Sequence, residues 1–107
     1  MIKLFSALAV FALASCATEP EPDWPKTCDA AVQWLLDELP EAERDNLAST
    51  KSEDLILLHF GLGRGIRNNF GLWGGNLALI EDCSGDPAKH PDDVSMIIIE
   101  RLWLALQ

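Results

Sequence analysis

The chain has 107 residues, of which 49% are apolar and 23% are charged. This length fits one small domain, because domains usually contain about 100 to 150 residues, and the apolar content excludes disorder throughout. Eight basic and 17 acidic residues give a formal net charge of -9. That charge excludes nucleic acid as a partner, because binding to phosphates requires basic side chains.

The N-terminus has the layout of a signal peptide, with Lys3 as its positive start. Residues 4–14 are apolar or small apart from Ser6, a run well short of the roughly 20 residues that cross a bilayer as a helix. The run ends in Leu13-Ala14-Ser15-Cys16, which resembles the lipobox of bacterial lipoproteins, whose cysteine is diacylated and becomes the mature N-terminus. We therefore expect a lipoprotein signal peptide at residues 1–15 and lipidation of Cys16. An ordinary signal peptide with an incidental cysteine is the alternative.

The resemblance to lipoproteins also implies a location. Ala17, and not aspartate, follows the cysteine, which implies that retention in the inner membrane is not signalled. Two or three acyl chains hold a protein permanently at a membrane. We expect a protein of the bacterial cell envelope, lipid-anchored in the outer membrane and facing the periplasm. Its membrane partner is then bound through the N-terminal lipid.

Residues 16–25 contain three prolines and predict an extended tether between the lipid and the domain. Trp24 lies in this segment, and we expect it to pack onto the edge of the domain. Residues 26–107 are expected to form an all-α domain, a small bundle of about four to five helices.

Thr27 predicts an N-cap, and apolar residues recur at helical spacing from Cys28 to Leu39. Pro40 ends this helix and is well placed to open a short, polar one at residues 41–48. The first helix is therefore expected to bury one apolar stripe, and the second to be weakly held.

The third helix is expected to begin with Ser52 as its cap and to continue to Phe70. Residues 55–58 are all apolar, which predicts burial on most sides. Glycines 61, 63 and 65 each cost a helix about 1 kcal/mol relative to alanine. We favour a continuous helix that another element approaches closely at Gly61 and Gly65, and a loop is the alternative.

A turn at residues 71–75 precedes a short helix at residues 77–82, which Asn76 can cap. After a loop, Pro91 suits a first helical position, and the last helix is expected at residues 94–106. Because this helix is apolar on several faces, we expect it to be central.

Cys28 and Cys83 remain as a pair in an oxidising compartment once Cys16 is lipidated. We therefore predict a disulfide between them, and two buried free thiols are the alternative. The sequence has no Cys-x-x-Cys motif, which argues against a redox role.

Arg64 and Arg67 lie one helical turn apart and could together hold one anionic group. Pairing with Glu53, Asp54 or the acidic start of the last helix is the alternative that we prefer. The glycines around Arg64 lack the preceding strand and the Gly-Lys-Ser/Thr ending of a phosphate loop, so no nucleotide or other cofactor is predicted.

His59, His90, Asp92 and Asp93 could supply metal ligands or an acid/base pair, but they lack a zinc-binding spacing. Ser95 has no evident general base. We therefore predict no catalytic residues and no metal.

Two segments resemble an uncharacterised family of small bacterial domains. They are residues 59–73, HFGLGRGIRNNFGLW, and residues 90–98, HPDDVSMII. The family is a domain of unknown function, so the resemblance implies a single helical unit and supplies no reaction. The candidate ligand or motif residues that it singles out are Arg67, Asn68, Trp73, His90, Asp92, Asp93 and Ser95.

Our leading hypothesis is a monomeric, lipid-anchored, non-catalytic binding or structural module that interacts with an envelope protein. One alternative is a small metal-dependent or acid/base hydrolase that uses His59, His90 and Asp93, and another is an envelope inhibitor or immunity lipoprotein. An open pocket at Arg67, Asn68, His90 and Asp93 would favour ligand binding. A closed network would mean that these residues hold the helices together.

Overall fold

The computed structural model describes residues 22–107, which contain six helices and no strand. This confirms the all-α fold, with one helix more than the expected four to five. The predictions for the signal peptide, Cys16 and the first part of the tether lie outside the described residues. The helices are α2 (Cys28–Glu38), α3 (Glu41–Ala48), the 3-10 helix η1 (Ser52–Leu58), α4 (Leu62–Asn69), α5 (Leu77–Ser84) and α6 (Pro91–Ala105).

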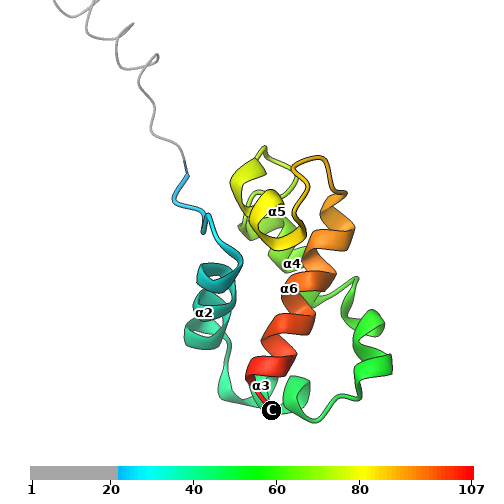
Figure 1. The fold of residues 1–107 in the computed structure, drawn as a ribbon. Helices are drawn as coiled ribbons and strands as arrows, with labels where there is room; N and C mark the ends of the chain where they lie inside the picture. Colours follow the sequence, from blue (N-terminus) through cyan, green and yellow to red (C-terminus); the bar gives the residue numbers. More distant parts are fainter. Residues whose placement is uncertain (1–21) are drawn as a thin grey trace, which may run out of the picture.

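Helix α6 is the centre of the bundle, as its apolar faces predict. It contacts α2, α4, α5 and η1, and Figure 1 shows it in the middle, with α2 on one side and η1 on the other. Its residues Val94, Ile98, Ile99 and Leu102 are fully buried. Each such side chain stabilises the fold by about 1.5 to 3 kcal/mol relative to leaving it in water. The fold therefore depends on this last helix more than on any other.

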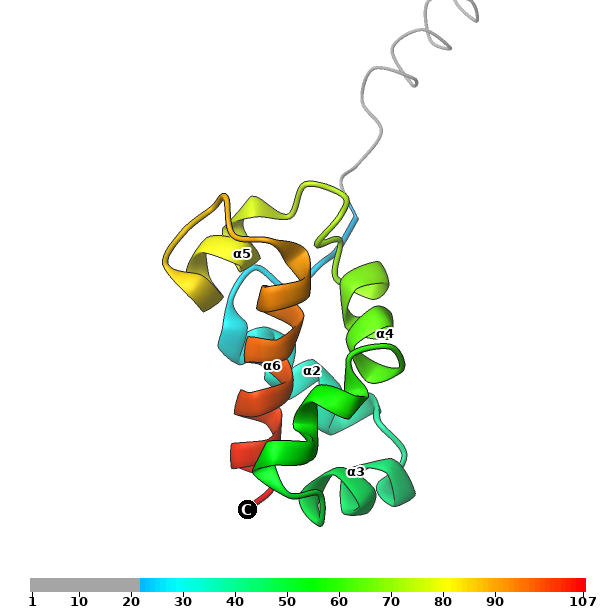
Figure 2. The ribbon, with the colours of Figure 1, turned by 90° about the vertical axis from the view of Figure 1, so that its right-hand side faces the viewer.

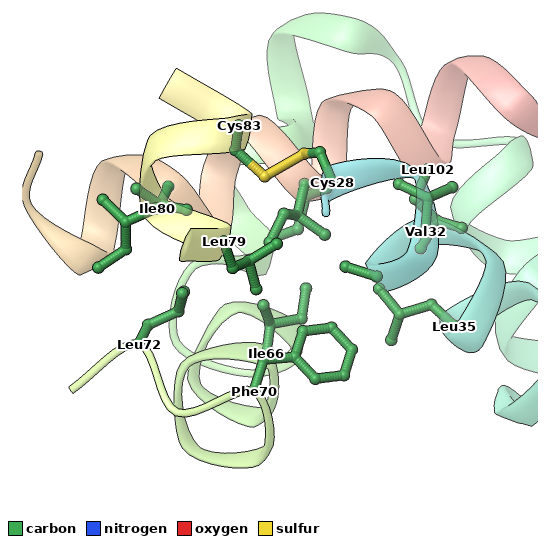
Figure 3. Packing of buried hydrophobic residues seen from close by; sticks show 14 of the residues in the cluster. Cys28, Val32, Leu35, Ile66, Phe70, Leu72, Leu79, Ile80, Cys83 and Leu102 are labelled. Carbon is green, nitrogen blue, oxygen red and sulfur yellow. A yellow bond between two sulfur atoms is a disulfide. The ribbon is translucent and has the colours of Figure 1, made fainter. Parts of the chain in front are cut away.

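Helix α2 forms as the sequence predicts. The Thr27 side chain accepts a hydrogen bond from the backbone N–H of Ala30 at 3.1 Å, which caps the helix. Val32 and Leu35 point from α2 into the core, where Figure 3 shows them near Phe70 and Leu102. Helix α3, in contrast, buries only Leu47, as its polar composition predicts.

The prediction of one continuous helix from Ser52 to Phe70 is wrong. The chain forms η1, turns at residues 59–61 and starts again as α4, with Gly61 at φ -95° and ψ -89°, away from helical geometry. The N-cap of η1 is Lys51, and Ser52 is its first helical residue. The alternative with a break at the glycines is therefore the observed one.

The predicted burial of residues 55–58 is also wrong. Leu55 is buried and Leu58 is half-buried, but Ile56 and Leu57 are 61% and 75% exposed, and Phe60 just beyond η1 is 74% exposed. A 3-10 helix has three residues per turn, so residues three apart lie on one face. Leu55 and Leu58 therefore face α6, whereas the two residues between them point away.

The segment before α2 packs onto the domain. The Trp24 ring lies against Gly71, where a Cβ atom would come within 2.3 Å of its Cε2 atom. Asn76 caps α5 as expected, and its Nδ2 also donates to the carbonyl oxygens of Pro25 and Phe70 at 2.9 and 2.8 Å. The last residues of the expected tether are thus part of the folded domain.

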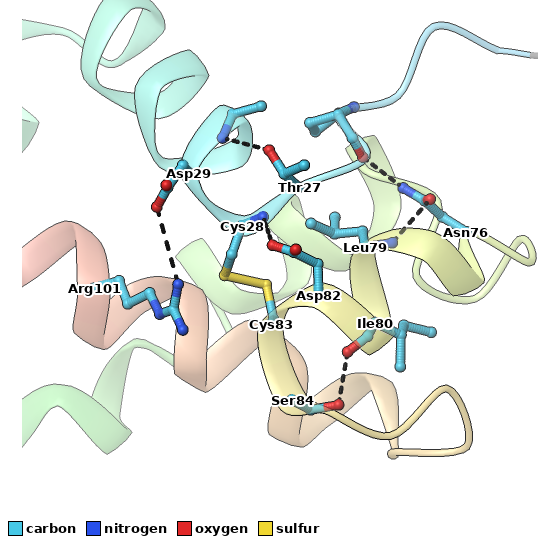
Figure 4. The surroundings of a disulfide bond; sticks show 12 residues. Thr27, Cys28, Asp29, Asn76, Leu79, Ile80, Asp82, Cys83, Ser84 and Arg101 are labelled. Carbon is cyan, nitrogen blue, oxygen red and sulfur yellow. Dashed lines mark hydrogen bonds and ion pairs between the residues drawn. A yellow bond between two sulfur atoms is a disulfide. The ribbon is translucent and has the colours of Figure 1, made fainter.

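Cys28 and Cys83 form the predicted disulfide, with their Cα atoms 5.0 Å apart (Figure 4). The adjacent Asp82 carboxylate accepts a hydrogen bond from the backbone N–H of Cys28 at 2.7 Å. The start of α2 is therefore joined to the end of α5 by a covalent bond and by a charged hydrogen bond. Among residues 22–107, no helix has both the length and the apolar content needed to cross a bilayer.

Candidate functional site

The two segments that resemble the uncharacterised family meet around the guanidinium group of Arg67, on α4. Its side chain is 7% exposed, its Nη1 donates to the Ser95 hydroxyl at 2.9 Å, and its Nη2 donates to the His59 carbonyl oxygen at 3.1 Å. Its Nε lies 3.4 Å from a carboxylate oxygen of Asp92. Arg67 thus pairs with the acidic start of α6, which is the pairing that we preferred from the sequence, and it also fixes the end of η1.

Ser95 has both hydrogen-bonding functions of its hydroxyl engaged. The side chain is fully buried, accepts from Arg67 and donates to the backbone carbonyl of Asp92 at 2.9 Å. A serine nucleophile needs a base that can take its proton. Because the proton of Ser95 is held by a backbone carbonyl, this hydroxyl acts as a structural link between α4 and α6.

Both histidines lie beside the Asp92 carboxylate. His59 Nε2 and His90 Nδ1 are 3.9 and 3.8 Å from the same Asp92 oxygen. His90 Nδ1 accepts a hydrogen bond from the backbone N–H of Asp92 at 3.0 Å, so this side chain caps α6. Its ring also meets Trp73 edge to face, with 5.2 Å between the ring centroids. The His90 side chain therefore ties the start of α6 to the turn before α5.

Gly63 makes room for this arrangement. A Cβ atom at Gly63 would lie 2.9 Å from Arg67 Nη1 and 3.4 Å from the Leu58 carbonyl oxygen. Gly61 and Gly65, where we expected the close approach, have open space instead. The glycine that packing requires in α4 is therefore the middle one of the three.

Three of the candidate residues lie outside the network. Arg64, Asn68 and Asp93 are exposed, and Arg64 and Arg67 do not converge on one anion site. Asp93 is the acid that the hydrolase alternative pairs with the histidines, but the structure brings Asp92 to them. Within residues 22–107, no group of three His, Cys, Asp or Glu side chains could hold a metal ion.

The buried part of the network is fully paired, since every buried side-chain nitrogen and oxygen in the described part of the chain has a hydrogen-bond partner. At its edge the Asp92 and His90 side chains are 42% and 55% exposed. A ligand group that reached Arg67 or Ser95 would have to displace a hydrogen bond that already exists. The motif residues thus hold three segments together: the end of η1, helix α4 and the start of α6.

A groove that the sequence does not predict lies on another side of the molecule. One hollow of about 520 Å³ lies between α3 and the start of α4, and a second of about 250 Å³ lies between α2 and α4. Leu39 and Leu62 line both hollows, so the two are adjacent. Figure 2 shows this side, with α4 above α3 and α2 behind them. The signal in the sequence was Trp34, which lies on α2 outside its buried stripe and remains 45% exposed.

The chain matches a known protein family. The family described as a domain of unknown function, DUF6794, matches residues 24–106. The match begins at Trp24, which packs on Gly71, and reaches the end of α6. No curated protein and no solved structure is significantly similar to the chain.

Proposed function

The chain belongs to the DUF6794 family, a domain of unknown function, and from this premise we propose that it is a lipid-anchored binding module of the bacterial cell envelope. The module has no catalysis of its own. It stands on the outer membrane through the lipid on Cys16 and presents its folded domain to an envelope partner.

The observation that carries the non-catalytic part of the proposal is the paired, buried core of the network, Arg67 with Ser95. The Ser95 hydroxyl donates a hydrogen bond to a backbone carbonyl and accepts one from Arg67. General acid/base catalysis needs a group that is within reach of substrate and free to exchange a proton. Ser95 and Arg67 are instead buried and engaged in holding helices together, which supports a structural role for them.

Export is supported by the Cys28–Cys83 disulfide, because disulfides persist in oxidising compartments such as the periplasm. The described chain begins near α5 at one end of the bundle, whereas α3 lies at the other end (Figure 1). An anchor at the N-terminus would therefore leave the α3 end directed away from the membrane. That end carries part of the apolar groove.

Anchoring is tested by the variant Cys16→Ser in cells grown with labelled palmitate. We expect palmitate on the natural protein and none on the variant, and we expect globomycin to block cleavage of the natural protein only. Unlabelled natural protein, or processing that globomycin leaves unchanged, would contradict the anchor.

Absence of catalysis is tested by incubating the purified protein with peptidoglycan fragments, peptides, and nitrophenyl esters and phosphates, with and without divalent metal ions. We expect no turnover above that of heat-denatured protein. Turnover that His59→Gln or His90→Gln abolishes, in protein whose circular dichroism is unchanged, would contradict the proposal and favour the hydrolase.

A further inference from the structure

The groove between α2, α3 and α4 has the size and lining of a binding surface for apolar side chains. Ligand sites usually enclose about 300 to 1,000 Å³ and are lined mostly by apolar residues. The larger hollow falls within this range, and four leucines line it together with the polar side chains of Glu43, Asn46 and Thr50. The leucines are Leu39, Leu47, Leu58 and Leu62. The smaller hollow extends it past Gly65 to Trp34. The two together form an elongated surface along α4.

Exposed apolar side chains continue from one edge of this groove. Leu58 and Gly61 line the larger hollow, and the neighbouring Leu57 and Phe60 are 75% and 74% exposed. Apolar side chains that remain open to water beside a hollow can take part in an interaction surface. Leu57 is exposed because it lies on the side of η1 that faces away from α6, and Phe60 is exposed in the turn between η1 and α4.

The charged side chains that line the groove are all acidic. Glu43 lines the larger hollow and Glu38 lines the smaller one. Among the described residues that line the two hollows, none is Lys, Arg or His. The whole chain is also acidic, with a formal charge of -9. A partner with basic side chains beside its apolar ones would therefore be complementary, whereas an acidic partner would be repelled.

We propose that this groove binds an amphipathic helix with a basic polar face, contributed by another polypeptide of the envelope. An apolar groove between helices suits a helical ligand, whose apolar residues recur every three to four positions. A ligand that adds a strand would need the edge of a sheet, and residues 22–107 contain no strand. The proposal extends the proposed function by naming its binding surface and the chemistry of the partner.

The first experiment uses synthetic peptides of about 20 residues, because isolated helices shorter than about 12 to 15 residues are marginal in water. One peptide places leucine at helical spacing with lysine between, a second replaces every lysine by glutamate, and a third scrambles the first. Fluorescence anisotropy of the labelled peptides measures binding to the purified protein. We expect the leucine-lysine peptide to bind at least about tenfold more tightly than the other two, because only it matches both the groove and its charge.

Gly65 provides a variant that blocks the groove without disturbing the fold. It lines the smaller hollow, and a Cβ atom there would meet nothing within 4 Å. Gly65→Gln places a long polar side chain on the groove, and we expect it to weaken binding of the leucine-lysine peptide about fivefold. The matched control Gly65→Ala changes the backbone in the same way but leaves the groove open, and its affinity should stay within about twofold of the natural protein.

Charge is tested by a second matched pair. Glu38→Gln with Glu43→Gln removes both acids of the groove, and Glu41→Gln with Glu81→Gln removes two exposed acids that do not line it. Both pairs change the net charge by the same amount. Only the first pair should weaken binding, by about threefold or more, because general attraction of a basic peptide to an acidic protein would be lost equally in both.

Several outcomes would overturn the proposal. These are equal binding of the lysine and glutamate peptides, an equal effect of the two glutamate pairs, or an affinity that Gly65→Gln leaves unchanged. Concentration-dependent dimers that Gly65→Gln abolishes would assign the groove to a second copy of the chain. Displacement of a fluorescent fatty acid by groove variants alone would assign it to a lipid. The titrations need no membrane, so a failure of the anchor in the palmitate experiment would leave them unaffected.

Discussion

The Arg67 side chain is buried and joins three segments of the chain through its guanidinium group. Its planar guanidinium presents donors in a fixed geometry, which lysine cannot reproduce. It uses them toward a serine hydroxyl, a backbone carbonyl and a carboxylate on segments that are distant in sequence. The side chain of Asp92 is 42% exposed, so the ion pair is partly screened and the two neutral acceptors matter more.

Arg67→Met should therefore lower the free energy of unfolding by about 2 to 3 kcal/mol, since it removes hydrogen bonds from a charged donor inside the fold. Urea unfolding followed by circular dichroism measures the change. Arg64→Met is the matched control, because Arg64 is exposed on the same helix, and its effect should stay within about 0.5 kcal/mol. Equal effects of the two substitutions would refute the structural role of Arg67.

Gly71 is constrained twice, by its backbone and by its neighbour. Its φ is +67°, and a Cβ atom would overlap the Trp24 ring. Gly71→Ala should cost more than about 2 kcal/mol, whereas Gly75→Ala, with φ +95° but open space, should cost about 1 kcal/mol. Thermal or urea unfolding measures the loss of stability in the two variants.

Trp24→Ala separates the two causes at Gly71. Combined with Gly71→Ala, it should destabilise by less than the sum of the single changes, because the ring that the new methyl group meets is gone. Strict additivity would show that Trp24 does not pack on Gly71 in solution.

At the scale of elements, the arrangement of η1 and α4 determines which apolar side chains of residues 55–60 are exposed. The apolar run at residues 55–58 forms a 3-10 helix that buries only one side against α6. The chain then turns at Gly61, so α4 packs against α6 independently of η1, and Arg67 reaches Ser95. Phe60 is exposed in the turn at this break, and Leu57 is exposed because it lies on the side of η1 that faces away from α6.

Two glycines of α4 should respond in opposite directions to alanine. Gly65→Ala should raise the free energy of unfolding by about 0.5 to 1 kcal/mol, because alanine favours the helix and the space is open. Gly63→Ala should lower it by about 1 to 3 kcal/mol, because the added methyl group would push on Arg67 and on the Leu58 carbonyl. Urea unfolding of the two variants measures both changes. The same sign for both would contradict the packing described for this helix.

At the scale of the whole molecule, the fold is closed by links between its first and later parts. The disulfide joins residues 55 positions apart, and Asn76 holds the Pro25 carbonyl that precedes α2. A small domain buries a limited apolar core, so such links contribute a large share of its stability.

Cys28→Ala with Cys83→Ala should lower the free energy of unfolding by about 4 kcal/mol, the chain-entropy value for a closed loop of this length. Urea unfolding of oxidised protein measures the difference. Reductant should reproduce most of the loss in the natural protein and have no effect on the double variant. A natural protein whose stability reductant leaves unchanged would contradict a stabilising disulfide.

The sequence by itself determined the features that depend on a few neighbouring residues. The caps at Thr27 and Asn76, the start of α6 at Pro91 and the polar character of α3 all follow from local hydrogen bonds and periodicity. The pairing of Cys28 with Cys83 follows because these two cysteines remain once Cys16 is assigned to the lipid. These features needed no knowledge of how the helices pack.

Only the tertiary structure decided the features that depend on partners far along the chain. Which side of residues 55–58 is buried, and where the glycines break the helix, depends on the surface that α6 offers. The choice of Asp92 over Asp93 depends on where α6 places each carboxylate relative to Arg67. The groove lies where α2, α3 and α4 leave space between them, so it cannot be predicted from any one segment. Local rules act within about one helical turn, whereas burial and side-chain pairing are set by contacts between turns that are distant in sequence.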